Sequence, residues 1–142
     1  MKILSLCSAI IAGLALFMTY GCEKEDEPII LGIAAGYGHS MVLRSDGSLW
    51  VWGYNNSNQL GDGTSDNRTT PFRLGTGYSN LAAGGSHSFA IKSDESLWGW
   101  GSNQDGQLGF GIADNESYAA VDVIGLQSGV TALAAGNGHT CA

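Results

Sequence analysis

The stretch that decides the fold is Ile33–Trp52, IAAGYGHSMVLRSDGSLWVW. It returns at Leu81–Trp100 as LAAGGSHSFAIKSDESLWGW, and its first half returns at Leu133–Ala142 as LAAGNGHTCA. Each copy places one histidine at the same position, and the chain has no others: His39, His87 and His139. A repeat of about 50 residues is typical of stacked or radial repeat architectures.

Short apolar runs alternate with turns inside each copy. In the first copy, Asp46-Gly47 lies between two alternating runs, which is a strong hairpin signal. Pro71 suits an outer strand, because an edge needs no amide donor there. The strands expected in the first copy are Leu31–Ala35, Ser40–Arg44, Ser48–Trp52 and Pro71–Leu74; in the second they are Leu81–Ala83, Ser88–Lys92, Leu97–Trp100 and Ala120–Ile124.

Four antiparallel strands per repeat at this period predict an all-β protein made of β-propeller blades. A helical solenoid is disfavoured, because no window keeps apolar residues at i, i+3 and i+4. Alanines on the first strand of each blade let neighbouring blades approach the axis closely. The large aromatic residues lie further along the blade, where they fill the widening space between sheets: Trp50, Trp52, Trp98 and Trp100.

Three motifs together resemble the repeat of the regulator of chromosome condensation family. They are the aliphatic-small-small-Gly-x-x-His pattern, Leu-Trp-x-Trp-Gly at Leu49–Gly53 and Leu97–Gly101, and Asn-x-x-x-Gln-Leu-Gly-x-Gly at Asn55–Gly63 and Asn103–Gly111. Two positions depart from the family pattern, since Asn58 and Glu95 each stand where a glycine is expected.

The resemblance implies a seven-bladed propeller, of which this chain supplies two blades and the start of a third. The repeats are expected at residues 30–80, 81–132 and 133–142, the last being incomplete. Two blades cannot close a ring and would leave strand edges open. We therefore expect the chain to be the first part of a longer propeller, with assembly of several copies into a ring as the alternative.

Residues 1–21 have the features of an export signal. Lys2 precedes an apolar run, and the run ends at Gly21-Cys22, which resembles a bacterial lipoprotein signal with Cys22 as the lipid-attachment residue. Thr19 departs from the leucine usual in such signals. We expect an outer-membrane or cell-surface lipoprotein, anchored in the membrane through Cys22. An uncleaved inner-membrane anchor and ordinary secretion are the alternatives.

Residues 22–29 are expected to form an acidic linker, and the whole chain is acidic, with a formal net charge of -7. Its few arginines and lysines are scattered, so nucleic acid is excluded as a partner, because phosphate binding needs clustered cations. After removal of the leader, Cys22 and Cys141 remain. Cys141 stands at the repeat position of Met41 and Phe89, which predicts a small buried apolar side chain.

No constellation of residues indicates catalysis. The histidines share one position per blade, so they are expected to be separated structural residues rather than one metal site. Each is expected to form a hydrogen bond to neighbouring backbone at its own glycine turn. Residues 62–67 are rich in acids but lack the spacing of a known calcium loop. The sequence has no phosphate-binding glycine loop, no Gly-x-Ser-x-Gly elbow and no His-Glu-x-x-His motif. We expect no catalytic residue, metal or cofactor.

The sequence features bear on three possible functions. The favoured one is a non-catalytic binding module of the bacterial cell envelope, which presents the loops Tyr54–Arg68 and Ser102–Tyr118 to a protein or glycan partner. The family name implies the alternative of guanine-nucleotide exchange on a small GTPase, but the export signal argues against a cytosolic role. An envelope enzyme has no residues in its favour, and the fold alone does not decide the function.

Overall fold

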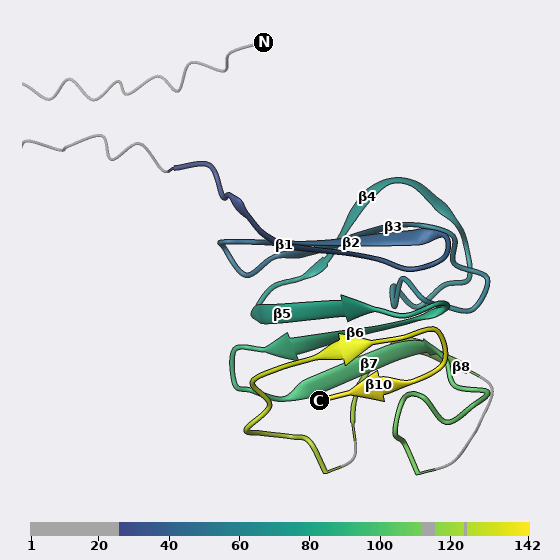
Figure 1. Cartoon of the computed structure of the whole chain (residues 1–142). Coiled ribbons are helices and arrows are strands. Elements are labelled where there is room, and N and C mark those ends of the chain that lie inside the picture. Colours follow the sequence, from purple (N-terminus) through teal and green to yellow (C-terminus); the bar gives the residue numbers. More distant parts are fainter. Residues whose placement is uncertain (1–25, 112–115, 124) are drawn as a thin grey trace, which may run out of the picture.

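The computed structural model describes residues 26–111, 116–123 and 125–142, and this part of the chain is all-β, as predicted. Two four-stranded antiparallel sheets and one two-stranded sheet follow one another along the chain (Figure 1). The first sheet comprises β1 Ile30–Ala35, β2 His39–Arg44, β3 Leu49–Gly53 and β4 Arg68–Gly75. The second comprises β5 Tyr78–Ala83, β6 His87–Lys92, β7 Leu97–Ser102 and β8 Glu116–Asp122, and the third comprises β9 Ala134–Ala135 and β10 Thr140–Cys141.

Each four-stranded sheet is a blade whose strands lie in sequence order, β1-β2-β3-β4 and β5-β6-β7-β8. The prediction of two blades and the start of a third is therefore confirmed for the described residues. The outer strands are longer than the sequence suggested: β4 begins three residues before Pro71, and β8 begins at Glu116 rather than Ala120. Pro71 lies in the outermost strand of its sheet, where an amide donor is not needed.

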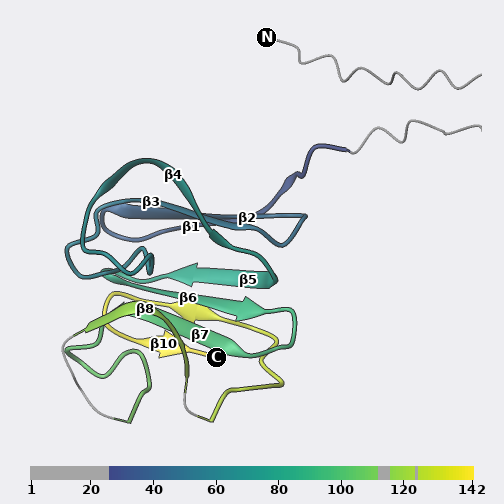
Figure 2. The same ribbon diagram turned by 180° about the vertical axis from the view of Figure 1, so that it is seen from behind.

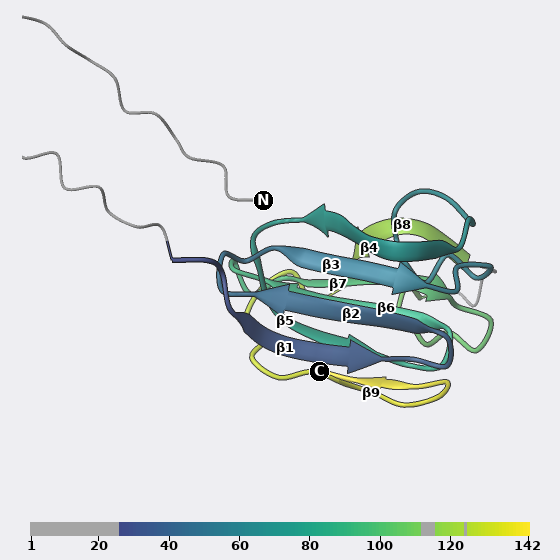
Figure 3. The ribbon, with the colours of Figure 1, turned by 90° about the horizontal axis from the view of Figure 1, so that it is seen from above.

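The innermost strands β1, β5 and β9 lie beside one another, and they carry the paired alanines of each repeat. Figure 3 shows these strands on one side of the stack, with the outer strands β4 and β8 on the opposite side. Side chains as small as alanine let the backbones of neighbouring blades come together at this narrow edge.

The main core lies between the first two blades. Met41, Leu43, Leu49 and Val51 point from the first blade toward the second, and Trp100 points back from β7. Exposure along β2 alternates between buried and half-buried residues, whereas five of the six residues of β6 are buried. The difference arises because the second blade is covered on both faces, and the first blade is covered on one (Figure 2). Full burial of a side chain as large as Trp100 contributes on the order of 3 kcal/mol.

The hairpin turns of the two blades have the same construction. Asp46 Oδ1 accepts hydrogen bonds from the Ser48 amide at 3.0 Å and the Ser48 hydroxyl at 2.6 Å, and Trp50 Nε1 donates to Ser48 Oγ at 3.0 Å. The second blade repeats these bonds with Asp94, Ser96 and Trp98. The sequence pattern Asp-x-Ser-x-Trp thus fixes the turn and one tryptophan of each blade.

Asn58 and Glu95, which stand where the family has glycine, both have a left-handed backbone conformation. Glu95 has a φ of 65°, beside 72° for Gly47 at the same position of the first blade. Asn58 has a φ of 57°, beside 73° for Gly106. Asparagine tolerates this left-handed conformation better than most residues, whereas glutamate does so at a cost of roughly 1 kcal/mol.

The prediction that Cys141 is buried is wrong. Cys141 pairs with Ala134 just as Met41 pairs with Ala34 and Phe89 with Ala82, so the register position is equivalent. Its side chain is nevertheless exposed, because no further sheet within the described residues packs against β10.

The end of the predicted linker is fixed to the first blade. Arg44 donates from Nη2 to the Pro28 carbonyl at 3.0 Å, and Ile29 and Ser45 exchange two hydrogen bonds, at 3.0 Å and 2.8 Å. The chain therefore enters the blade at the end that carries the Asp46 turn. The leader and Cys22 lie outside the described residues, within which no helix is long and apolar enough to cross a membrane.

Candidate functional site

The segments that follow β3 and β7 lie at one end of the blades, opposite the Asp46 and Asp94 turns. The tight turns between the first two strands of each sheet lie at this end, and so do the segments that follow β3 and β7 (Figures 1 and 3). We call this end the loop face, and among the described residues it comprises 36–38, 54–67, 84–86, 103–111 and 136–138.

A ladder of backbone hydrogen bonds joins the turns of the loop face. The Tyr37 amide donates to the Gly85 carbonyl at 3.0 Å, and the Gly85 amide donates to the Asn137 carbonyl at 3.2 Å. These three residues occupy the same variable position of successive repeats. Because each turn is bonded to the next, whatever side chain stands at this position is presented on a fixed backbone.

Two tyrosines project from the loop face. Tyr37 is 79% exposed and Tyr54 is 45% exposed, and both belong to the first blade. The Tyr54 amide donates to the Gly38 carbonyl at 2.7 Å, so the two tyrosine-bearing segments are joined to each other. Gly38 is required there, because a Cβ at that position would lie 2.9 Å from Tyr54 Cβ. Exposed aromatic rings on fixed backbone are a common feature of binding surfaces.

The segments after β3 and β7 are held by the Asn and Gln of their shared motif. Asn55 Oδ1 accepts from the Leu60 amide at 2.9 Å, and Asn103 Oδ1 accepts from the Leu108 amide at the same distance. Gln59 Oε1 accepts from the Ser57 amide, and Gln107 Oε1 accepts from the Asp105 amide, both at 2.9 Å. These residues shape the loops and leave the exposed positions between them free to vary.

Asp62 is bound within the loop rather than available to a cation. Its carboxylate accepts from Arg68 Nε, from the Thr64 amide at 3.0 Å and from the Thr64 hydroxyl at 2.8 Å. Burial opposes ionisation of Asp62, but these bonds and the Arg68 charge outweigh it and hold its pKa below the usual value. The arrangement makes Asp62 a structural anion, and Arg68 in turn lies over the Phe72 ring at 4.0 Å.

The repeat histidines connect one blade to the next. His39 Nε2 lies 2.8 Å from Ser88 Oγ, and Ser88 Oγ donates to the Gln59 carbonyl at 2.8 Å. A hydroxyl has one hydrogen to donate, so His39 Nε2 must carry a proton and donate to Ser88. Trp100 Nε1 donates to the same Gln59 carbonyl at 2.9 Å. The partner of His39 is therefore the next blade, not the neighbouring glycine turn that the sequence suggested.

The second histidine repeats the arrangement. His87 Nε2 lies 3.2 Å from Thr140 Oγ1 of β10, and a hydroxyl residue directly follows the histidine in every copy. His139 is exposed, since no later blade packs on it within the described residues. The glycine before each turn permits the close packing of the ring: a Cβ at Gly36 would lie 2.2 Å from His39 Cε1 and 2.4 Å from the Gly84 carbonyl oxygen.

Burial keeps the first two histidines neutral. It lowers the pKa of His39 to about 4, with a smaller contribution from the nearby His87. Burial likewise lowers the pKa of His87, against the opposing effect of a hydrogen bond to the backbone of His139. Among the described residues, no group of three or more His, Cys, Asp or Glu side chains could hold a metal ion.

The four tryptophans differ in their burial and in their hydrogen-bond partners. Trp50 and Trp98 are half-buried and bonded to their own turns, and Lys92 Nζ lies over the Trp98 ring at 3.3 Å. Trp100 is fully buried between the blades, whereas Trp52 at the same position of the first blade is half-buried on its uncovered face.

Sequence reasoning missed Tyr37 and the partners Ser88, Thr140 and Gln59. The hydroxyl residue that directly follows each histidine in the sequence could have identified two of these partners, Ser88 and Thr140.

Two models of the regulator of chromosome condensation (RCC1) repeat match the sequence. One covers residues 46–91 and 94–142, and the other covers residues 30–59 and 78–107. The chain belongs to the regulator of chromosome condensation repeat family.

Solved RCC1-type structures share the fold. Prp20p from Saccharomyces cerevisiae, in a structure described with its binding properties to Gsp1p and histones, is 22% identical with a TM-score of 0.68, over 79% of this chain and 30% of that one. Yeast RCC1 (Prp20), in a structure bound to Kap60, is 28% identical with a TM-score of 0.67, over 75% of this chain and 26% of that one. Human WBSCR16 is 23% identical with a TM-score of 0.65, over 74% of this chain and 28% of that one. The chain thus spans less than a third of the length of each structure.

Proposed function

We propose that this chain is a non-catalytic binding module of the bacterial cell envelope, and that the loop face is the surface it presents to a partner. The observation that supports this most directly is the pair of exposed tyrosines, Tyr37 and Tyr54, on hydrogen-bonded backbone. Tyrosine offers a large apolar ring and a hydroxyl with few rotatable bonds, so it binds at a low cost in conformational entropy.

A protein partner is favoured over a glycan. Two of the solved RCC1-type structures are described with protein partners, Gsp1p and histones in one and Kap60 in the other. The loop face of this chain also exposes Asp66 and Asp105, which would suit a partner with a basic or mixed surface. The same acidic character disfavours nucleic acid.

The chain enters the first blade at the end opposite the loop face, which suits a membrane tether at that end. Cys22 stands eight positions before Ile30, where β1 begins, and Pro28 and Ile29 are bonded to Arg44 and Ser45 at the turn end of the blade. A lipid on Cys22 would therefore hold the turn end toward the membrane and direct the loop face away from it. This arrangement would leave Tyr37 and Tyr54 accessible to a partner.

Site-specific photocrosslinking in the native bacterium tests the binding surface. A photoreactive phenylalanine analogue replaces Tyr37 or Tyr54 in the full chain, and a control replaces Thr70, which is exposed on the outer strand β4. We expect a discrete adduct from the two loop-face positions and none from Thr70. A protease-resistant, glycosidase-sensitive adduct would identify a glycan instead, and equal adducts from all three positions would contradict the proposed surface.

Labelling with tritiated palmitate tests the location independently. We expect the native chain to incorporate label and fractionate with membranes, and the Cys22→Ser variant to lose both properties. An unlabelled cytosolic chain would contradict the envelope role and favour nucleotide exchange on a small GTPase, which purified GTPase loaded with a fluorescent guanine nucleotide would then test.

A further inference from the structure

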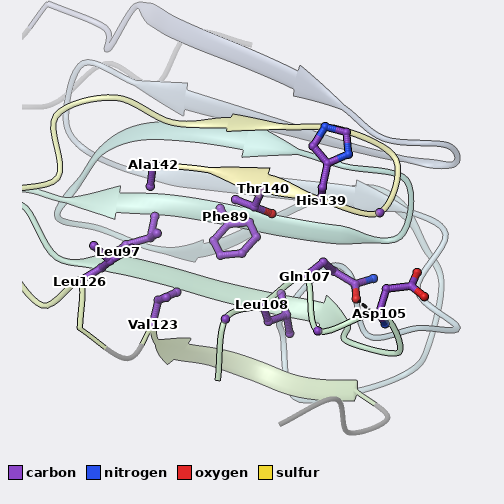
Figure 4. Close-up of a pocket in the computed structure, with 13 residues that line it drawn as sticks. Phe89, Leu97, Asp105, Gln107, Leu108, Val123, Leu126, His139, Thr140 and Ala142 are labelled. Atoms are coloured by element: carbon purple, nitrogen blue, oxygen red, sulfur yellow. Dashed lines mark hydrogen bonds between the residues drawn. The ribbon is translucent and has the colours of Figure 1, made fainter. Parts of the chain in front are cut away.

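Some of the exposed apolar groups are explained by the packing of successive repeats. A cavity of about 330 Å³ beside β10 has Phe89 in its lining (Figure 4), and a further repeat would cover it. Ile30 and Ile33 of the first blade are exposed as well. Their counterparts in the second blade, Tyr78 and Leu81, are buried against the first blade, so a neighbouring repeat would bury Ile30 and Ile33 in the same way.

The exposure of Ile29 and Leu31 has a different origin. Ile29 and Gly77 hold the same place, because each accepts a hydrogen bond of 2.8 Å from the residue after the second strand of its sheet. Leu31 and Ser79 lie at the point where β1 and β5 shift register against the next strand. Gly77 and Ser79 are exposed although the first blade packs against β5. Ile29 and Leu31 therefore remain exposed whether or not a neighbouring repeat is present.

Apolar residues occupy these two exposed positions in the first repeat alone. Val130 donates to the hairpin turn of the second blade as Tyr78 donates to that of the first, both at 3.1 Å. The third repeat thus has Gly129 and Thr131 at the two positions, and both are exposed. The other repeats carry glycine or a hydroxyl residue where the first repeat carries isoleucine and leucine. The first repeat is also the one that the leader joins.

We propose that Ile29 and Leu31 form a second contact with the membrane, at the surface of the bilayer that holds the lipid on Cys22. This inference rests on the proposed envelope location. Cys22 stands seven positions before Ile29, so the chain between them spans at most about 25 Å. Side chains that are 66% and 62% exposed enter the boundary between head groups and acyl chains. The contact fixes the turn end on the membrane and directs the loop face away from it.

A bilayer suits this pair of side chains better than a protein partner does. Two side chains supply far less than the roughly 800 Å² that each partner contributes to a stable protein interface. The charged side chains exposed at the turn end, within the described residues, are mainly acidic and include Asp46, Asp94 and Glu95, beside the cation Arg73. An acidic end is repelled by anionic lipids, so we expect the contact to favour head groups without net charge.

A fluorescent label at residue 79 tests the contact in the lipidated chain, purified from bacterial membranes. Ser79→Cys carries an NBD dye, and Cys141→Ser removes the other thiol that would react. The phosphatidylcholine vesicles contain a lipid with a nitroxide on its head group, which quenches dyes at the bilayer surface. We expect quenching at residue 79 and none for a dye on Thr70→Cys, on the outer strand β4. Ile29→Ser combined with Leu31→Ser should reduce quenching at residue 79 by at least about threefold.

A conservative pair of substitutions is the matched control. Ile29→Leu with Leu31→Ile keeps the apolar character and should keep the quenching. Equal quenching at residues 70 and 79, no quenching at residue 79, or quenching that survives the two serines would overturn the contact, provided that the chain sediments with the vesicles. A native chain that carries no lipid and stays in the supernatant would instead overturn the envelope location, and this inference with it.

Discussion

His39 of the first blade and Ser88 of the second blade are joined by a hydrogen bond of 2.8 Å across 49 residues of sequence. The bond is buried, and Ser88 passes its own hydrogen to the Gln59 carbonyl. The pair therefore couples a strand of one blade to both a strand and a loop of its neighbour. A buried link of this kind makes the stability of one blade depend on the presence of the other.

The first prediction concerns this bond. Ser88→Ala leaves the buried Nε2 of His39 without its acceptor, which should lower the free energy of unfolding by about 1–3 kcal/mol. Ser40→Ala is the matched control, because Ser40 holds the same repeat position on a face that meets no other blade in the described residues. Urea denaturation followed by tryptophan fluorescence measures both variants. Equal effects would mean that the inter-blade bond contributes nothing specific.

Acid should weaken the protein through its buried histidines. The pKa of His39 is about 4 in the folded chain, against about 6.5 when unfolded, so below pH 6.5 the unfolded state binds a proton that the folded state does not. Stability is fully present above pH 6.5 and falls as the pH drops toward 4, by up to about 3 kcal/mol for this residue. His87 acts in the same direction.

The histidine effect can be separated from that of the carboxylates. The pKa values of Asp46 and Asp94 are lowered by hydrogen bonds from Ser48 and Ser96, so stability from these two groups is lost only below their ordinary value near 3.8. Urea midpoints at pH 7.5, 6.5, 5.5 and 4.5 therefore report mainly on the histidines. A flat profile across this range would contradict the predicted burial of neutral His39.

Replacing one strained residue should stabilise the second blade. Glu95→Gly removes a side chain from a φ of 65°, and Gly47 shows that glycine serves at this turn position. We expect a gain of roughly 1 kcal/mol, because the left-handed conformation no longer costs steric energy. Gly47→Ala should shift stability in the opposite direction. Thermal unfolding of both variants measures the effect, and a loss on Glu95→Gly would show that the glutamate side chain makes a compensating interaction.

The close packing of Trp100 on Gly61 allows a matched pair of glycine substitutions. Gly61→Ala adds a Cβ 2.6 Å from the Trp100 ring, whereas Gly63→Ala meets nothing within 4 Å, and both residues have positive φ. Gly63→Ala should cost about 1 kcal/mol for backbone strain alone. Gly61→Ala should cost about 1–3 kcal/mol more, because the ring must move in a packed interface. Similar losses in the two variants would contradict close packing of Trp100 on Gly61.

The repeat alone was sufficient to predict most of the fold. Aligned copies place the inner strands within three residues of their observed bounds, because turn residues such as Asp46-Gly47 mark where a strand must end. The start of β8 was missed, because its first residues follow a polar loop and lack an apolar pattern. The burial of Cys141 was predicted wrongly. Its repeat position determines on which face of the sheet the side chain lies, but burial depends on whether another sheet packs against that face.

The site was less predictable than the fold. The side chains that shape the loops, Asn55 and Gln59, stand in a motif visible in the sequence, and their hydrogen bonds are local. The partner of His39 is not local, and nothing within one repeat says that the ring reaches into the next. Exposure of Tyr37 likewise depends on how successive turns are joined to each other, which no single turn reveals.

The link from each histidine to the following blade has a consequence for synthesis on the ribosome. His39 emerges first, and its hydroxyl partner is translated 49 residues later; His87 waits 53 residues for Thr140. A nascent blade therefore keeps its histidine exposed to solvent, as His139 is, until its successor has been made, and it is completed from its C-terminal side. Assembly is directional: each new blade closes the one before it, and translation sets the order in which the propeller grows.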